Sequence, residues 1–591
     1  MNREDMCLNF WTLFDKKKWF FRSNLQPNEP ASNSTFAENN KKSLSPKSKN
    51  ALAAILPDID FHRECSSREV DQGEFEAEKH FYPRVVNAEV HSLIETFLSL
   101  GNDRIVARHT NINPRVKPDV LKSILSYSPS HFQWAGSDLF NVTTASGQRQ
   151  MIVIETNSCP SGQKSMPFLS ENSDRSAQGG YRLVIESAFE NQLSKADPNL
   201  GGLAMICDKN MMESSGYAAV LADVAKEKVW LCEWFMNDPD PDVKWDDGVM
   251  YVRDKEMVWH SIRACFRYLT QKPWNRFPIK TKTIVVNEII SCIAGGRNKI
   301  MAAIAYDLYN AELTGTGLSI RTPQTINNVT RSEIPFYIKS LGGRGVLKVP
   351  YSNAGQGVYT ITNKTELNDF MGQNYHYDKA CTFLVQSLVG KASWSSRTKA
   401  DMFYHVGTIP SKNNNTYVTD LRLMVTGTKN GFRPVCIFGR RAKNPLSSEL
   451  SPDVNSWEML GTNLSLQSPN GTWTTDTTRL ILMDRNDFSQ LGLSIDDLID
   501  AYIQTVLAVV GIDRMAKKLL ANGEFDYKLF KSLNPDNALI DEIRQANGEP
   551  TLFRKSSSLV YNRAKILEAV ALLHDISVNH YAWRWGLWIA E

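Results

Sequence analysis

The sequence lacks the features that mark a membrane, secreted or zinc-finger protein. It has no apolar run long enough to cross a bilayer, and its nine cysteines include no C-x-x-C pair. The first residues carry acidic side chains and no following apolar segment, unlike a signal peptide. The net charge of +3 is small for 591 residues, so nucleic acid and anionic membranes are not expected as partners. We therefore expect a cytoplasmic protein with buried thiols, no nucleic-acid partner and no membrane association.

The sequence also lacks an arrangement for covalent catalysis. None of its ten histidines is paired with another at metal-ligand spacing, and no Ser–His–Asp or Cys–His arrangement is evident. A hydrophobic content of 42% and a charged content of 22% are typical of a soluble globular protein. The length corresponds to roughly three to five domains.

Composition and periodicity predict an α/β (α+β) chain in five segments. Residues 1–50 are rich in Asn, Ser, Pro and Lys, and we expect a disordered polar tail there. Residues 51–177 should hold helices and then a strand hairpin. Residues 178–290 should form an inserted substrate subdomain with a small parallel sheet, because short apolar strands alternate with helices. Residues 291–484 carry glycine-rich motifs, and residues 485–591 should be helical.

Two long helical patterns lie outside the glycine-rich part. Apolar residues recur three and four apart over 84–126, which predicts helices. A long amphipathic helix is predicted over 495–520, with Gly523 as its stop. The aromatic and basic residues of 1–22 and the Trp-rich segment 581–588 predict either docked ends or interfaces, and the sequence does not choose between them.

The most informative stretch is 152–162, where three β-branched residues lead into Glu155 and Asn157. Alternation places these two side chains on the same face of a strand. The preceding strand, 134–142, should pair with it as a hairpin and bring Asp138 to the same place. Carboxylate and amide oxygens are ligands that Mg²⁺ takes alongside nucleotide phosphates. An isolated E-x-N is more often a strand that ends in a polar turn, but the third oxygen ligand favours a Mg²⁺ site.

A second motif, residues 345–359, carries Lys348 on a strand that runs into a polar, glycine-containing loop and a return strand. Glycines let backbone amides approach phosphate oxygens, and the lysine adds a point charge. A hairpin with a glycine turn is the alternative, but the loop is longer than a tight hairpin needs, which favours a mobile lid. The glycine-rich entry 295–299 to a helix over 300–312 also suits phosphate, and an ordinary loop is equally compatible with it.

Three further strands carry polar residues suited to a nucleotide. Strand 381–389 contains Gln386, and its backbone could pair with an adenine edge between apolar walls. Alternation puts Asp420 and Arg422 on one face of the next strand, 418–425. Arginines at strand ends near a phosphate site suit a planar anion clamp. A plain buried strand and surface ion pairs are the respective alternatives.

Together these stretches resemble an ATP-grasp ligase whose order is circularly permuted. The E-x-N strand normally follows the lysine strand and lid, whereas here Glu155 precedes Lys348. That order is similar to the eukaryotic-type glutathione synthetases and the related glutathionylspermidine synthetases. The resemblance covers roughly residues 130–470, and it rests on segments 136–140, 154–157, 298–299, 346–348 with the lid, and 384–386.

The resemblance implies a permuted ATP-grasp body with a glycine lid, and ATP and Mg²⁺ as cofactors. It implies small-molecule carboxylate and amine substrates, such as an amino acid, a peptide or a polyamine, and a homodimer follows from it alone. The site residues that it implies, together with the candidate arginines, are as follows: for ATP, Lys299, Lys348, Ser352, Asn353, Gly355, Gln356, Gly357, Gln386, Ser387 and Leu388; for Mg²⁺, Asp138, Glu155 and Asn157; for substrate, Ser158, Ser161 and Arg267; for catalysis, Arg422 and Arg441.

The chain departs from the family pattern at two positions. Gly136 stands where the glutathione synthetases have an arginine for the peptide substrate, which argues against γ-glutamylcysteine. Ser352 stands where they have a metal-binding glutamate, which weakens a second metal site or leaves Asp138 or Asp420 to supply the oxygen. The expected activity is ATP-dependent formation of an amide bond through an acyl phosphate. A kinase that stops at the phosphorylated product and a degenerate ATP-binding scaffold are the alternatives.

Overall fold

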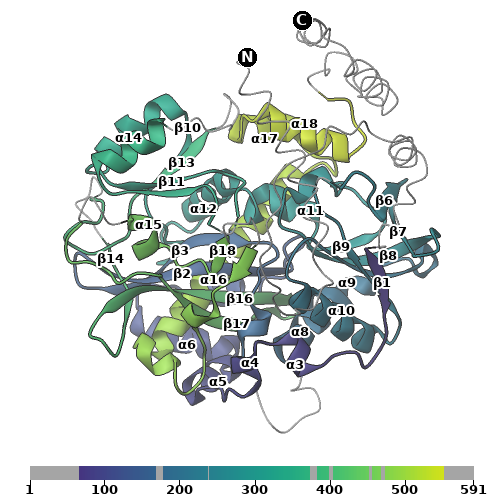
Figure 1. Ribbon diagram of the computed structural model, residues 1–591, viewed down its shortest axis with the longest axis horizontal. Coiled ribbons are helices and arrows are strands. Elements are labelled where there is room, and N and C mark those ends of the chain that lie inside the picture. Colours follow the sequence, from purple (N-terminus) through teal and green to yellow (C-terminus); the bar gives the residue numbers. More distant parts are fainter. Residues whose placement is uncertain are drawn as a thin grey trace, which may run out of the picture. The chain divides into compact units, whose positions relative to one another are not determined.

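The structure is a computed structural model that describes residues 66–551, except 168–177, 237, 354, 373–381, 398–403, 451–454 and 468–472. The predictions for the polar tail and for the aromatic segments at both ends lie outside the described residues. Within them the chain is a mixed α/β protein with several sheets, as the sequence predicts (Figure 1). The boundaries of the five segments stay predictions.

The helical pattern over 84–126 is confirmed. It becomes α4 (Pro83–Val86), α5 (Ser92–Ser99), α6 (Gly101–Ile112) and α7 (Pro118–Leu125). Proline at the first position of α4 and of α7 suits a helix start, where no amide donor is needed. Leu121, Ile124 and Leu125 of α7 are buried, so the three- and four-residue spacing forms the core-facing side.

Residues 202–286 and strand β1 (Ser67–Val70) build one seven-stranded sheet. Its central strands are parallel, and its outer strands at both sides are antiparallel. Parallel pairs join β5 (Val229–Glu233) to β4 (Gly202–Cys207), β4 to β8 (Trp259–Tyr268), and β8 to β9 (Ile284–Val286). The sheet is completed by antiparallel strands, so it is mixed and not the purely parallel sheet that the sequence predicts; they are β1 (Ser67–Val70), β6 (Val243–Asp246) and β7 (Val249–Arg253). Helices α8 (Gly179–Val184), α9 (Glu190–Leu193) and α10 (Met211–Ala225) belong to this part.

A second, antiparallel sheet contains the predicted hairpin. Strands β2 (Trp134–Thr144) and β3 (Arg149–Asn157) pair with each other, and β2 also pairs with β16 (Thr416–Thr428), which pairs with β17 (Gly431–Arg441). Shorter strands complete the sheet: β14 (Tyr404–Val406), β15 (Thr408–Pro410) and β20 (Leu480–Ile481). The sheet therefore joins residues of the 51–177 segment to residues of the 291–484 segment.

A third sheet carries the lysine motif. Its antiparallel order is β10 (Thr325–Val329), β13 (Phe383–Gln386), β11 (Gly345–Lys348) and β12 (Val358–Ile361). Helices α13 (Ile334–Ser340) and α14 (Lys364–Gly372) belong to the same part, at the upper left of Figure 1. Its buried residues, among them Ile338, Leu347 and Phe370, form a small separate core.

Two helices pack behind the hairpin. Helix α16 (Ile495–Leu519) begins at a capping box between Ser494 and Asp497 and packs against β3, β2 and α12 (Lys299–Glu312). The sequence predicts an amphipathic helix here, but every residue of α16 from 498 to 513 except the half-buried Asp500 is buried, because neighbouring elements cover most of its surface. The C-terminal part ends in α17 (Tyr527–Leu533) and α18 (Asn537–Ala546).

Two expectations about environment can be compared with the described part of the chain. None of the helices in it is long and apolar enough to cross a membrane. All six cysteines that it contains, from Cys159 to Cys436, are buried, which agrees with the burial predicted for them.

Candidate functional site

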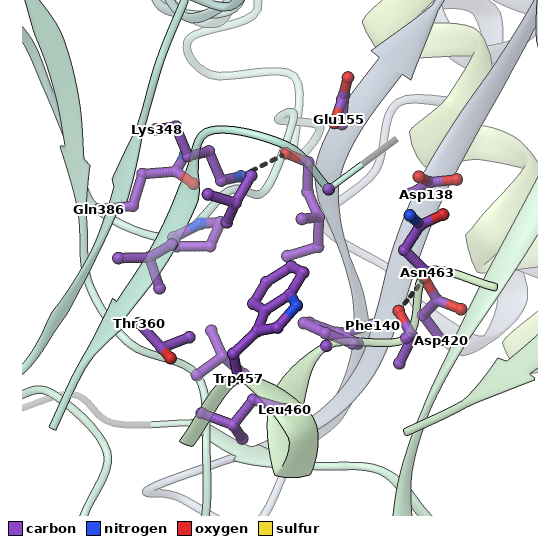
Figure 2. Close-up of a pocket in the computed structure, with 18 of the residues that line it drawn as sticks. Asp138, Phe140, Glu155, Lys348, Thr360, Gln386, Asp420, Trp457, Leu460 and Asn463 are labelled. Atoms are coloured by element: carbon purple, nitrogen blue, oxygen red, sulfur yellow. Dashed lines mark hydrogen bonds between the residues drawn. The ribbon is translucent and has the colours of Figure 1, made fainter. Parts of the chain in front are cut away.

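A cavity of about 160 Å³ lies between the hairpin sheet and the lysine-bearing sheet. Its walls combine charged residues at one end with apolar residues at the other, a typical layout for a small-molecule site (Figure 2). Thirteen of the predicted site residues line it: Asp138, Glu155, Asn157, Lys299, Lys348, Ser352, Asn353, Gly355, Gln356, Gln386, Ser387, Leu388 and Arg422.

The hairpin brings its three oxygen-bearing side chains to one place. Asp138 lies directly opposite Glu155 in the β2–β3 register, and Gly136 lies opposite Asn157. Position 136 has no room for a side chain, because a Cβ there would lie 2.7 Å from the Cβ of Pro160. The turn after β3 therefore fills the space that a side chain at position 136 would need.

Asp138 is held by arginines of the neighbouring strands. Arg422 donates from Nε and Nη2 to its two oxygens at 2.6 and 2.8 Å, and Arg440 lies 3.0 Å from Oδ2. Arg440 also donates from Nε to Asp420 at 3.0 Å, and Thr462 donates to Asp420 at 2.8 Å. Burial would raise the pKa of Asp138, but the charges of Arg422 and Arg440 outweigh it and hold the pKa well below its usual range. Asp138 is therefore a member of a buried charge network.

Two lysines from different elements converge on the cavity. Lys348 of β11 donates to the carbonyl of Ile154 at 3.2 Å, and Lys299 of α12 lies 3.5 Å from Oε1 of Glu155 and donates to the carbonyl of Ser352. Burial lowers the pKa of Lys348 to about 8, with the charge of Lys299 acting in the same direction and that of Glu155 opposing it. Burial also lowers the pKa of Lys299. Two desolvated ammonium groups this close together favour a polyanionic ligand.

Glu155 and Asn157 are the residues that fit a magnesium ion. The described residues contain no group of three or more His, Cys, Asp or Glu side chains placed to hold a metal. Mg²⁺, however, commonly uses one or two protein oxygens together with substrate phosphates. Glu155 and Asn157 both face the cavity, and Asn157 Oδ1 accepts a hydrogen bond from Arg297 at 3.2 Å. This donor set suits an ion bridged by phosphates and does not suit a closed, all-protein metal site.

Four residues of the predicted lid line the cavity, namely Ser352, Asn353, Gly355 and Gln356. Val349 donates to the carbonyl of Gly357 at 2.7 Å, and Gln356 donates to the carbonyl of Asn353 at 2.9 Å. Gly355 and Gly357 both have positive φ, which glycine adopts without steric cost. Gly357 itself is absent from the cavity lining, so it acts in the loop's turn.

The apolar end of the cavity differs from the predicted adenine hinge. The amide of Ser387 donates to Gln324 at 2.9 Å, and the amide of Leu388 donates to Ser396 Oγ at 2.8 Å. These backbone donors are therefore already used within the protein. The Ser387 hydroxyl is 4% exposed with no hydrogen-bond partner among the described residues, and Ser387 lines the cavity. A base edge would meet this hydroxyl and not the backbone amides.

Trp457 is the largest lining residue that sequence reasoning missed. It lies on the short helix α15 (Ser456–Leu460), and Figure 2 shows its indole projecting into the cavity between Lys348 and Phe140. A Cβ at Gly355 would lie 3.0 Å from its ring, so the lid closes against it. A single tryptophan in a polar stretch gives no periodic signal, and only the fold brings it to the cavity. Arg297 was also missed, as part of an unremarkable loop before α12.

Besides Gly357, four predicted site residues lie away from the cavity lining. Ser158 is fully buried, with its Oγ 3.1 Å from Cys292 Sγ, and Ser161 Oγ is bonded to Asn210 and Tyr268. Arg267 is fully buried and donates from Nε to the carbonyl of Asn287 at 2.9 Å. Arg441 stacks its guanidinium over the ring of Tyr417, because it points to the face of β17 opposite Arg440. These side chains pack or stabilise the fold and do not face the site.

Comparisons with known proteins give matches among solved structures alone. No family model matches the chain, and no curated protein matches it. The chain is similar to a glutathione synthetase-like effector from Globodera pallida in its apo form, at 10% identity and a TM-score of 0.33, over 60% of this chain and 85% of that one. It is also similar to a RimK domain ATP-grasp protein from Sphaerobacter thermophilus, at 12% identity and a TM-score of 0.23, over 40% and 89%.

A third similar structure is N5-carboxyaminoimidazole synthetase from Staphylococcus aureus complexed with ADP, at 9% identity and a TM-score of 0.17, over 47% of this chain and 80% of that one. Because every TM-score is below 0.5, we base the functional argument on the residues of the site.

Proposed function

We propose that this chain is an ATP-dependent carboxylate–amine ligase of the ATP-grasp type. One observation carries the proposal: Lys348 from one sheet, Lys299 from a helix N-terminus and the Glu155–Asn157 pair from a second sheet surround one cavity with an apolar end. Cations and oxygen ligands at one end suit a triphosphate with its metal, and the apolar end suits a base.

In the proposed reaction a substrate carboxylate oxygen attacks the γ-phosphorus of ATP, and the bond to the departing ADP oxygen breaks. The amine nitrogen then attacks the acyl carbon, inorganic phosphate leaves, and the nitrogen loses a proton. Lys299 and Lys348 would neutralise the phosphates, and the 352–357 loop would exclude water. Glu155 and Asn157 would hold Mg²⁺, which supplies charge neutralisation on the phosphates when bound. No side-chain nucleophile is required, which agrees with the sequence.

The role of Asp138 changes in this proposal. Its two oxygens accept three contacts from Arg422 and Arg440. A metal ligand would have to leave a buried, bidentate ion pair, which costs several kcal/mol. Asp138 therefore orients Arg422, which also lines the cavity.

A binding scaffold is the second candidate, and one observation favours it. Asp138 is neutralised by arginines and Ser352 replaces an acidic residue of the related synthetases, so fewer oxygens remain for metals than catalysis by two ions requires. A scaffold would bind ATP without turnover.

To test the ligase activity, the protein is incubated with Mg-ATP and a panel of carboxylates, and hydroxylamine serves as a general amine. A ligase releases ADP and converts the acyl phosphate to a hydroxamate, and Lys348→Met should abolish both products. ADP release with a phosphorylated product and no hydroxamate would identify a kinase. Tight ATP binding without ADP from any carboxylate would favour the scaffold.

A further inference from the structure

A second cavity lies next to the nucleotide cavity, along helix α12. It has a volume of about 270 Å³, and its far wall is formed by α12 and the segment 322–325. It shares with the first cavity the residues that would surround the γ-phosphate, namely Glu155, Lys299 and Lys348. We call it the α12 cavity. A molecule in it would lie beside the transferring phosphate, and the two cavities also share Ile154, Pro323 and Gln386.

The inner end of the α12 cavity contains a buried cation with an unused donor. Arg297 is 7% exposed and donates from Nη1 to Asn157 and from Nη2 to the carbonyl of Thr270. Its Nε has no hydrogen-bond partner among the described residues. An unpaired buried donor on a charged group is costly unless a ligand or water satisfies it. The donor therefore points to an anionic or acceptor group in this cavity.

The charges of the cavity are arranged along its length. The inner end holds three cations, Arg297, Lys299 and Lys348, against the single carboxylate of Glu155. Asp307, two turns further along α12, lines the cavity and is exposed, so it lies at the rim. No hydrogen bond or ion pair to Asp307 is found within the described part of the chain. The cavity is thus positive inside and negative at its rim.

We propose that the α12 cavity binds the carboxylate substrate, with its carboxylate at Arg297 and a positively charged group at the opposite end, near Asp307. Helix α12 begins at Lys299, so its residues from Lys299 to Asp307 span about 12 Å of helix, and Arg297 adds to this length from the loop before it. The proposal rests on the proposed function, because the carboxylate must meet the γ-phosphate held by Lys299 and Lys348. It adds the class of substrate: a zwitterionic chain about as long as an extended peptide of four residues.

Oligoglycines of one to five residues measure the length of peptide that this cavity accommodates. With Mg-ATP and hydroxylamine, ADP release should show a KM that falls with length and levels off at about four residues. N-acetylation of tetraglycine removes its positive charge and should raise the KM about fivefold, the upper range for an exposed ion pair. Asp307→Asn should raise the KM of tetraglycine equally and remove the effect of acetylation. Glu312→Gln is the matched control, because this carboxylate of α12 pairs with Arg514 on the surface, and it should change nothing.

Arg297→Lys tests the inner end while keeping the charge and the fold. It should weaken tetraglycine binding at least about tenfold, since a lysine cannot reproduce the planar fork. Binding is measured by calorimetry with a non-hydrolysable ATP analogue, and melting temperature reports whether each variant folds. Unchanged tetraglycine affinity in Arg297→Lys would overturn the proposal. A KM that does not depend on peptide length would also overturn it, and so would an acetylation effect on the KM that is as large in Asp307→Asn as in the wild type. If the wild type binds ATP but none of the peptides, this inference fails alone; if it does not bind ATP, the proposed function fails with it.

Discussion

Arg422 forms a bidentate ion pair with Asp138, in which Nε donates to Oδ1 at 2.6 Å and Nη2 donates to Oδ2 at 2.8 Å. The pair joins β2 to its neighbour β16 at one wall of the nucleotide cavity. The sequence predicts Asp138 to be a metal ligand, but in the structure its carboxylate holds the side chain of Arg422 in place. At this wall the charges of Arg422 and Arg440 are balanced by Asp138 and Asp420.

Asp138→Asn should destabilise the fold by about 3–5 kcal/mol, because it leaves Arg422 buried without its counter-charge and leaves Arg440 with Asp420 alone. Urea unfolding at neutral pH measures this loss. The lowered pKa of Asp138 means that its stabilisation is complete above its unfolded pKa of about 3.9 and is lost as the pH falls through its folded value. The stability gap between wild type and variant should therefore shrink below about pH 4. A variant of wild-type stability that no longer responds to Mg²⁺ would restore the metal role.

Nucleotide affinity should fall as the pH rises above 8. The pKa of Lys348 in the free protein is lowered to about 8, so the side chain loses its charge at higher pH, and the charged form is the one that pairs with phosphate. ATP binding at pH 8.5 should then take up a proton. Calorimetry in two buffers of different ionisation enthalpy measures that proton, and Lys348→Met should reduce the uptake. Proton release, or no exchange in the wild type, would contradict the assignment.

Trp457→Ala should weaken ATP binding by about 1–3 kcal/mol, the range for an aromatic ring stacked on a base. Trp457→Phe should recover most of the loss. Inorganic tripolyphosphate is the internal control, because it lacks the base and its affinity should be the same in all three proteins. An equal loss for ATP and tripolyphosphate would mean that the indole supports the fold of the cavity and does not contact the base.

Gly355→Ala should raise the Kd for ATP, because its Cβ would lie 3.0 Å from the Trp457 ring and push the lid away. Gly343→Ala is a matched control: both glycines have φ near +80°, but a Cβ at Gly343 meets nothing within 4 Å. Both substitutions should cost a similar amount of stability, about 1 kcal/mol, from the backbone conformation alone. The prediction fails if the two variants bind ATP with the same affinity.

Local patterns predict the elements of this chain better than they predict its contacts. The hairpin with Asp138 opposite Glu155, the lysine strand with its return strand and helix α12 follow from alternation, glycine turns and capping, and all are confirmed. The metal role of Asp138 could not be tested by such patterns, because the arginines that bind it come from strands almost three hundred residues later.

Three further differences have the same origin. Arg441 and Arg440 are neighbours on β17, so alternation sends one of them into the cavity and the other to Tyr417. Trp457 carries no periodic signal. Helix α16 is buried on more than the one face expected of an amphipathic helix, because neighbouring elements also cover its other side. Each difference concerns contacts between elements distant in the sequence, which the local pattern does not contain.

The most direct test of the account is a calorimetric titration of the protein with ATP and Mg²⁺, repeated with Lys348→Met and with Lys339→Met. Lys339 is an exposed lysine on α13, outside the cavity. We expect the wild type and Lys339→Met to bind ATP equally, and Lys348→Met to lose at least about tenfold in affinity, as for a charged hydrogen bond. Equal affinity in all three proteins, or no binding by the wild type, would contradict the assignment of this cavity to ATP.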